Sequence, residues 1–460
     1  MIGIGGIGMS ALAQVLLARG VTVSGSDIQK SPLTDQLSSA GATVFIGHSA
    51  EQVEGAQEVV ISDAVHQENP ELSRARALGL PVRRRSELLG SLMLEARGLA
   101  VAGTHGKTTV TAMIGLILAD SGADPTVILG GELPAIGGNA RAGAGDWFVA
   151  EACEAYESFL HLHPEIAVLT NIEADHLDHH KTETHLRESF AQFVQTLPQN
   201  GTLVVCADRS ELRELSPPSG TTIVRYGTDE ESHVRGLRVR TSGGMGRCDL
   251  VVEGEPAGEL TVGVPGDHNI MNALGATAAA LAAGAKVEDC QRSLKRFSGV
   301  GRRFELVGEG SDITVVDDYA HHPTEIDATI AAARDAFSGR RIVALFQPHL
   351  YSRTRDFAES FAKALGSADL AVLTEIYPAR EAPIPGISSG LIADHMRTLL
   401  GKDAVTEMAK QDVVTVLPAN LKAGDVVLVM GAGDIGRTAR ELAAHLGGLP
   451  RPNRSSITKQ

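Results

Sequence analysis

Short apolar runs alternate with helical patterns along almost the whole chain, in three successive blocks. In the first block, IGIGG, VTVSGSD, ATVFIGH and EVVISDAV predict strands, with helices such as SALAQVLLARG between them. In the second, WFVAEA, IAVLTNI and TLVVCA predict strands, and TTIVRYG with the two runs after it predicts an antiparallel patch. In the third, DITVVDDY, RIVALFQP, LAVLTEIY and DVVLVMGAGDI predict strands, again separated by helices. Strands that alternate with helices favour parallel sheets covered on both faces.

These blocks predict an α/β protein with three domains. We expect a Rossmann-like domain at residues 1–95, a central domain with a mixed sheet at 96–302, and a second Rossmann-like domain at 303–448. The polar end of the chain, 449–460, is expected to be disordered. A length of 460 residues is more than one hydrophobic core organises, which agrees with several domains.

Composition narrows the class of protein. A net charge of −15 argues against binding nucleic acid or an anionic membrane. The four cysteines are scattered singly, without the CxxC pairs of a zinc ribbon, and fit thiols in a reducing cytoplasm. The sequence shows no apolar run of the roughly 18 residues that cross a bilayer. We therefore expect a soluble, cytoplasmic protein, as a monomer or homodimer.

The stretch VAGTHGKTTVTAM, residues 101–113, predicts a phosphate-binding loop. The strict GxxxxGK[ST] pattern fails because Val101 stands where it requires glycine. A strand, a glycine turn and a helix remain, so backbone N–H groups and the helix N-terminus would face phosphates. Lys107 would reach the β and γ phosphates of a nucleoside triphosphate, and Thr108 could bind Mg²⁺.

A second glycine-rich turn, GIGGIGMS, lies at residues 3–10 and satisfies G-x-G-x-x-G. Asp27 follows the next predicted strand, near the distance at which a carboxylate contacts a ribose. Taken alone, this motif is typical of a dinucleotide-dependent oxidoreductase, which would not need a triphosphate loop. A nucleotide-diphosphate substrate in the first domain and ATP in the second reconcile the two turns.

Carboxylates follow two strands of the central block. Glu151 ends one strand, and Glu173, Asp175 and His176 follow another. The carboxyl ends of parallel strands share one edge of a sheet, so Glu151, His176 and Thr108 could meet around Mg²⁺ or Mn²⁺. A solvated acidic turn, or a site for another transition metal, is the alternative for this segment.

Eight motifs, taken in order, resemble the Mur ligases of peptidoglycan synthesis over nearly the whole chain. They are GIGGIGMS, GTHGKTT, TNIEADHLD, GDHNIMNALGA, GRRFE, DDYAHHPTEI, FQPHLYSRT and YPAREAPIPG. The resemblance implies three domains that bind a UDP-sugar, ATP and an amino acid. It also implies ATP-driven amide formation, in which UDP-N-acetylmuramate is activated as an acyl phosphate and then attacked by the amine of L-alanine.

The resemblance also implies roles for particular residues. The residues implied in catalysis are Lys107, Glu151, His176, Arg303 and His321. Those implied in ATP binding are Gly103, Thr104, His105, Gly106, Lys107, Thr108, Thr109, Asn269, Arg303 and Asp318. Those implied at the UDP-sugar are Gly3, Gly5, Gly6, Gly8, Met9, Ser10, Asp27 and Tyr319. His349 and Arg353 would hold the amino acid, and Thr108, Glu151 and His176 the metal. Helix capping by Asn269, core packing in DDYAHHP and a surface position for Arg302 are the structural alternatives.

Three features depart from the family pattern. Leu350 stands where arginine usually follows the histidine of FQPH, so one carboxylate contact is lost or moved, for example to Arg355. Arg380 replaces a more usual glycine. The chain opens directly on Met1-Ile2, so we expect the native start to lie upstream, which an intact mass would test.

Three rival functions remain open. A recycling ligase would join UDP-N-acetylmuramate to a preformed tripeptide and would need a more open third domain. A dinucleotide-dependent oxidoreductase would transfer hydride to NAD. A non-catalytic, nucleotide-gated regulator would not need the full set Lys107, Thr108, Glu151 and His176.

Overall fold

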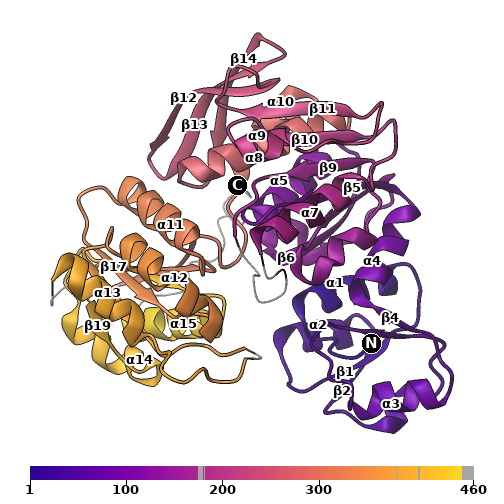
Figure 1. The fold of residues 1–460 in the computed structure, drawn as a ribbon, viewed down its shortest axis with the longest axis horizontal. Helices are drawn as coiled ribbons and strands as arrows, with labels where there is room; N and C mark the ends of the chain where they lie inside the picture. The colour runs from indigo at the N-terminus through magenta and orange to yellow at the C-terminus, as the bar shows by residue number, and fades with distance from the viewer. Residues whose placement is uncertain (175–179, 181, 380, 402–404, 448–460) are drawn as a thin grey trace, which may run out of the picture. The chain divides into compact units, whose positions relative to one another are not determined.

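The computed structural model describes residues 1–174, 180, 182–379, 381–401 and 405–447 (Figure 1). The chain forms two compact units. The first comprises Met1–Leu237, Leu250–Gly258 and Asn272–Leu294, and the second comprises Arg238–Asp249, Glu259–Met271 and Lys295–Gln460. Among the described residues, no helix is both long enough and apolar enough to cross a membrane.

The first 95 residues build a parallel sheet with helices around it. Ile2 forms parallel bridges to Ser26 on one side and to Ile61 on the other, so it joins the two strand pairs β1·β2 and β3·β4. The strands are β1 (Ser24–Asp27), β2 (Thr43–Ile46), β3 (Val59–Ile61) and β4 (Val82–Arg84). The helices are α1 (Ile7–Ala18), α2 (Pro32–Ser39), η1 (Ala50–Val53), α3 (Pro70–Ala77) and α4 (Arg85–Leu94). The predicted parallel arrangement of this block is confirmed.

A ten-stranded mixed sheet follows, in the order β14-β13-β12-β11-β10-β9-β5-β8-β6-β7. Its strands are β5 (Arg97–Ala102), β6 (Thr126–Leu133), β7 (Gly138–Arg141), β8 (Trp147–Glu151), β9 (Ile166–Leu169), β10 (Thr202–Cys206), β11 (Thr222–Gly227), β12 (Val234–Ser242), β13 (Met245–Val252) and β14 (Glu255–Val262). β5 lies between β8 and β9 and is parallel to both. The phosphate loop therefore leaves the sheet beside the ends of β8 and β9.

Helices and short 3-10 turns connect these strands. They are α5 (Lys107–Asp120), η2 (Pro134–Ile136), η3 (Ala155–His161), α7 (Glu183–Val194), α8 (Ser210–Arg213), α9 (Asp267–Ala282) and α10 (Val287–Arg296). The antiparallel patch predicted from TTIVRYG onward is wrong for that run, since β11 is parallel to β10 and to β12. The polar residues in β11 and β12 are also typical of a half-exposed hairpin, and for this reason the sequence pattern predicted antiparallel pairing.

The second unit contains a six-stranded sheet in the order β15-β16-β20-β17-β18-β19. Its strands are β15 (Glu305–Gly310), β16 (Ile313–Asp318), β17 (Ile342–Phe346), β18 (Leu370–Leu373), β19 (Val405–Glu407) and β20 (Val426–Met430). All neighbours are parallel except β15 and β16. The central strands are apolar throughout, as strands buried on both faces must be.

Two apolar cores fill the two faces of this sheet. One contains Ile326, Phe361 and Met396 from three helices, and the other contains Val413 and Leu442 from two more. The helices and turns are α11 (Pro323–Ala336), α12 (Tyr351–Leu365), α13 (Gly390–Leu400), η5 (Lys410–Asp412), α14 (Val413–Val416), η6 (Leu417–Asn420) and α15 (Ile435–His445). This is the predicted Rossmann-like layering of the third block. The boundaries at 95, 302 and 448 stay predictions, and 449–460 lies outside the described residues.

Candidate functional site

The phosphate loop lies where the sequence predicts it, between the end of β5 and the start of α5. Gly103 has φ +135° and Gly106 has φ +85°, conformations that residues with side chains rarely adopt. A Cβ on Gly103 would lie 2.0 Å from Thr170 Oγ1, and one on Gly106 would lie 2.5 Å from Asn272 Oδ1. The loop is therefore packed too closely for any residue but glycine at these two positions.

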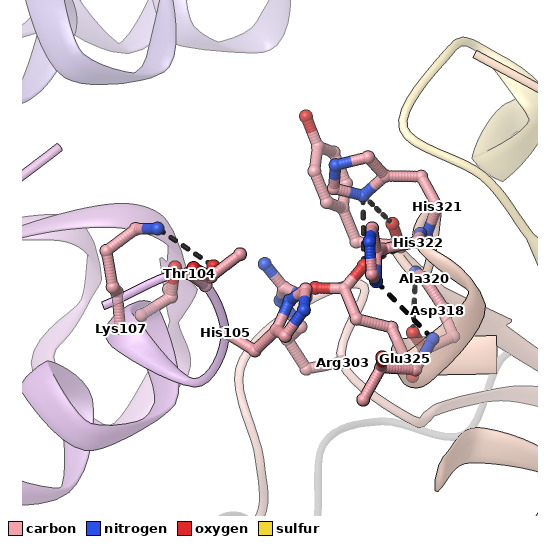
Figure 2. Close-up of polar contacts among 12 residues, drawn as sticks. Thr104, His105, Lys107, Arg303, Asp318, Ala320, His321, His322 and Glu325 are labelled. Atoms are coloured by element: carbon pink, nitrogen blue, oxygen red, sulfur yellow. Dashed lines mark hydrogen bonds and ion pairs between the residues drawn. The ribbon is translucent and has the colours of Figure 1, made fainter. Parts of the chain in front are cut away.

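Lys107 is folded back over the loop (Figure 2). Its ammonium donates to the carbonyl oxygens of Gly103 at 2.6 Å and Thr104 at 3.0 Å, and to the Glu154 carboxylate at 2.9 Å. Burial acts to lower the pKa of Lys107, but the carboxylates of Glu154 and Glu151 outweigh it and raise the pKa above its usual value. The side chain therefore carries a fixed positive charge at the mouth of the loop.

Glu154 is a residue that the sequence reasoning missed. Its side chain is 2% exposed and lies at the N-terminal end of η3, three residues after Glu151. The second glutamate of VAEACEAY could have indicated this role. It follows a strand that ends beside the phosphate loop, so its carboxylate lies within reach of the Lys107 ammonium.

Thr108 and Glu151 form the predicted pair at the adjoining strand ends. The Thr108 hydroxyl donates to Glu151 Oε2 at 3.0 Å, and the Gly130 N–H also donates to this carboxylate. An alcohol and a carboxylate that converge beside the loop are the hard oxygen ligands that Mg²⁺ prefers, so the residues fit this ion. Asp175 and His176, the other predicted metal residues, lie outside the described residues.

The segment after β9 forms the floor of the loop. Asn171 accepts from the His105 N–H at 2.9 Å through its side-chain oxygen, and Thr170 Oγ1 donates to the His105 carbonyl at 2.6 Å. Thr104 Oγ1 accepts from the Glu173 N–H at 2.9 Å. These hydrogen bonds connect Thr104 and His105 to the segment that follows β9 and so restrict the conformation of the loop.

The predicted adenine contacts lie at the start of α9. Asn269 is buried, and its amide donates to the Pro265 carbonyl at 2.7 Å, which is a local structural bond of the kind that competes with a ligand role. Removal from water, with a further contribution from Arg303, lowers the pKa of His268 to about 4. His268 is thus neutral at physiological pH.

In the second unit, Asp318 ends β16 and is buried. Its carboxyl accepts from the Phe304 N–H and the Ala320 N–H, both at 2.7 Å (Figure 2). Burial raises the pKa of Asp318 to about 6 although Arg303 and these two N–H groups oppose the rise. A buried carboxyl group whose pKa is shifted this far is a candidate functional residue.

Arg303, His321 and Glu325 gather beside Asp318 (Figure 2). The Arg303 guanidinium lies 5.0 Å from the Tyr319 ring centre and 3.7 Å from Glu325. The His321 ring lies within hydrogen-bond distance of the Tyr319 carbonyl, 2.9 Å, and of Glu325, 3.1 Å. The structure therefore brings together the predicted residues of GRRFE and DDYAHHP within this unit.

Arg302 does not lie free on the surface, which was the structural alternative for this residue. It bonds within the second unit. Its guanidinium donates to the carbonyls of Gly431 at 2.6 Å and Gly433 at 3.1 Å and faces the buried Asp317 at 3.4 Å. Desolvation raises the pKa of Asp317 despite this cation. The GAGDIG turn, which resembles a dinucleotide motif, is thus fastened to the start of the third block.

The predicted amino-acid residues lie around the start of α12. The His349 ring stacks on Tyr377 at 5.7 Å between centroids, and Arg353 is buried. Leu350, the departure from the family pattern, has φ +70° and directly precedes the helix. Arg355, the alternative position for the missing carboxylate contact, is half-exposed and pairs with Asp356 at 2.7 Å. Arg380 lies outside the described residues.

The first glycine turn is braced by Asp27, whose carboxylate accepts from the Gly5 N–H at 2.9 Å. Gly3 adopts φ +79°, and a Cβ there would lie 2.9 Å from Ser62 Oγ. Gly6 directly precedes α1, and Gly8 lies in the first turn of this helix. Met9 and Ser10, predicted at the UDP-sugar, are both buried.

Asn139 connects this turn to the central sheet. It is 0% exposed, donates to the Ile7 carbonyl at 2.6 Å and to Ser10 Oγ at 2.9 Å, and accepts from Gln14 at 2.8 Å. Sequence reasoning gave this residue no role. Ser10 is therefore engaged in joining α1 to β7.

Comparison with known proteins agrees with this geometry. Three family models match in chain order: "Mur ligase family, catalytic domain" at residues 1–97, "Mur ligase middle domain" at 101–280, and "Mur ligase, glutamate ligase domain" at 302–433. The chain belongs to the Mur ligase family, and the predicted three-domain α/β class is confirmed.

Individual relatives show which members of the family this chain resembles. The chain is 44% identical to a UDP-N-acetylmuramate–L-alanine ligase of Burkholderia cenocepacia, over 97% of each chain. It is 46% identical to one of Salinibacter ruber, over 95% of this chain and 93% of the relative. The crystal structure of UDP-N-acetylmuramate-alanine ligase MurC from Thermotoga maritima superposes with a TM-score of 0.82 at 31% identity, covering 97% of this chain and 98% of the other. A murein peptide ligase from Psychrobacter arcticus gives 0.73 at 27% identity, covering 97% and 98%.

Proposed function

We propose that this chain joins L-alanine to the lactyl carboxylate of UDP-N-acetylmuramate and converts ATP to ADP and phosphate, in the synthesis of peptidoglycan precursors. The observation that carries the proposal is the phosphate loop with Lys107 above it and the Thr108–Glu151 pair beside it. This loop lies in a chain that matches L-alanine ligases end to end. The two glycine turns then serve two nucleotides, the UDP group at residues 3–8 and ATP at 103–109.

The reaction consists of two transfers. A lactyl carboxylate oxygen attacks the γ-phosphorus of ATP, the bond to the β-γ bridging oxygen breaks, and ADP leaves an acyl phosphate. The amine of L-alanine then attacks the acyl carbon, phosphate leaves, and the ammonium protons pass to solvent. Neither transfer needs a nucleophile from the protein, so its part is positioning and charge neutralisation.

Residues of the first unit supply most of that neutralisation. The Lys107 ammonium and the loop N–H groups would bind the β and γ phosphates, and the N-terminus of α5 adds its dipole. Thr108 and Glu151 would hold Mg²⁺, or Mn²⁺ in its place, and His176 is proposed as a further ligand. The ion, when bound, would screen the negative charge of the phosphates.

Residues of the second unit would serve the remaining groups. Asp318 is proposed to bind the ATP ribose and Arg303 the transferring phosphate. Tyr319 and His321 are proposed to face the sugar-nucleotide and the amino acid. His349 and Arg353 are proposed to bind the amino acid, Arg353 through its carboxylate. With Leu350 in place of the arginine of the family pattern, Arg353 would carry that contact.

The test is ADP release by the purified chain with UDP-N-acetylmuramate, ATP and Mg²⁺, and with L-alanine, L-serine, glycine or a murein tripeptide as acceptor. The proposal requires turnover with L-alanine to exceed turnover with the tripeptide. The reverse order would assign the chain to the recycling ligases, and NAD reduction without ADP release would return it to the oxidoreductases. We place the enzyme in the cytoplasm, where its four free thiols stay reduced.

A further inference from the structure

The ammonium of Lys107 is saturated. An ammonium group has three N–H donors, and here three acceptors meet it: the carbonyls of Gly103 and Thr104 and the carboxylate of Glu154. A phosphate oxygen can therefore bind Lys107 only if one of these acceptors gives up its place.

The three acceptors are not equivalent. The two carbonyls belong to the loop itself, whose conformation is fixed by Thr170 and Asn171 beneath it. Glu154 comes from a different element, at the end of the segment that follows β8. Because a phosphate that enters the loop must approach over the backbone N–H groups, the side-chain contact is the one that can be exchanged.

The backbone of Glu154 is anchored beside Lys107. Its side chain is almost wholly buried, and its own carbonyl lies 3.2 Å from Nε2 of the buried His180. Cys153 stays a neutral thiol, since burial raises its pKa to about 11. Glu151 is occupied by Thr108 and Gly130. Glu154 is thus the carboxylate that directly neutralises Lys107 in the described part of this site.

We propose that Glu154 is a placeholder for the nucleotide: it occupies the phosphate-binding donor of Lys107 until ATP displaces it, and so sets how tightly ATP and ADP bind. The proposal rests on the assignment of ATP to this loop. The carboxylate lowers affinity in two ways, because it competes for the ammonium and because its negative charge repels the incoming phosphates. Weaker binding of ADP has a use, since this product must leave after each cycle.

The experiment measures the dissociation constants of a non-hydrolysable ATP analogue and of ADP, each with Mg²⁺, by calorimetry on the full chain. Glu154→Gln keeps the shape and an oxygen acceptor but removes the charge. We expect this variant to bind both nucleotides about tenfold more tightly than the unmodified chain, because the competing state is weakened. A residue that merely supported the fold would give the opposite change, since damage to the loop weakens binding.

Four further variants make the test specific. Glu157→Gln removes a neighbouring carboxylate on the same turn that pairs with His185 at 3.8 Å, and it should leave both constants unchanged. Lys107→Ala should weaken binding strongly and abolish phosphate release. In the Lys107→Ala background, Glu154→Gln should tighten binding by a clearly smaller factor, because the competition for the ammonium is gone and only the repulsion of the phosphates remains. Glu154→Asp withdraws the charge by one methylene and should tighten binding by a smaller factor.

The outcomes separate this inference from the proposed function. If the unmodified chain binds nucleotide and Lys107→Ala weakens it, but Glu154→Gln binds equally or less tightly, the placeholder role is wrong and the ATP assignment stands. Equal tightening with and without Lys107 would also overturn the role, since the effect would then be general repulsion. If the unmodified chain binds no nucleotide, both proposals fail together. Should Glu154→Gln prove unstable in a thermal melt, the Asp variant decides.

Discussion

The side-chain amide of Asn139 donates to Ser10 Oγ at 2.9 Å, in a place where neither residue is exposed to water. This bond, with a second to the Ile7 carbonyl, fastens the helix behind the first glycine turn to the edge of the central sheet. The helix behind the first glycine turn is thus connected to β7 of the central sheet through one buried side chain.

We expect Asn139→Ala to lower the free energy of unfolding by about 1–3 kcal/mol, because it removes two hydrogen bonds donated from a buried position and leaves the Gln14 amide without this acceptor. It should also raise KM for the UDP-sugar more than KM for ATP, since α1 carries the first turn. Urea unfolding and initial-rate kinetics measure the two effects. Gln14→Ala, which removes one bond at the rim of the same network, is the control and should cost less; equal stability of the Asn139 variant would contradict the role.

Glu151→Ala should raise the Mg²⁺ concentration needed for half-maximal ADP release and lower turnover at least 100-fold. The variant removes the carboxylate that faces the Thr108 hydroxyl and so weakens the proposed ion site. A metal titration at saturating ATP checks this result, with Glu132→Ala, on the exposed end of β6, as the control. An unchanged titration curve would count against the site.

Gly103→Ala should abolish nucleotide binding and destabilise the chain. The new methyl group would lie 2.0 Å from Thr170 Oγ1, which belongs to the floor of the loop and cannot withdraw cheaply. Gly122→Ala is the matched control, because Gly122 also has a positive φ, +85°, but no atom within 4 Å of the added Cβ. It should cost only the left-handed backbone penalty of about 1–2 kcal/mol and leave ATP binding intact. Calorimetry and thermal melts distinguish the two variants.

Asp318 and His268 should make contributions of opposite sign to the change of the unfolding free energy with pH. Between about pH 4 and 6, folded Asp318 retains a proton that the unfolded chain releases, so it makes stability fall as pH rises. Folded His268 stays neutral where the unfolded ring, with its usual pKa of 6.5, is protonated, so it makes stability rise with pH. Each contribution is on the order of 3 kcal/mol.

The prediction is therefore a change of slope. Asp318→Asn should make the free energy of unfolding rise more steeply from pH 4 to 6, and His268→Gln should make it rise less steeply or fall. Urea unfolding at half-unit pH steps measures both slopes. Parallel curves for the variants and the unmodified chain over this range would show that neither group is buried in the way described.

The sequence predicted most of the fold because apolar runs and glycine turns are local signals. β5, the phosphate loop and α5 follow one another as the pattern requires, and the long Ala-rich run from Asp267 forms α9. The direction of β11 could not be read in the same way. Strand direction depends on partners elsewhere along the chain, and the residues of β11 carry little information about them.

The site was predicted in outline, and the misses share one physical cause. Lys107, Thr108 and Glu151 belong to local sequence motifs, and the residue types in these motifs indicate their chemistry. Asn139 and Glu154 act through contacts that span more than 40 residues each, and no local pattern marks an asparagine or a second glutamate for such a role. Arg302 was missed in the same manner, since its partners lie about 130 residues further on.

The tight packing around Gly103 and Gly106 bears on inhibition of this enzyme. A compound whose anchoring bonds go to the main-chain amides of this loop would meet a target that point substitution cannot easily alter, because any added side-chain atom strikes Thr170 or Asn272 before it strikes the drug. Bacteria that escape such a compound would have to change its uptake or its abundance relative to the enzyme. The steric intolerance of two glycines would thus become a barrier to resistance.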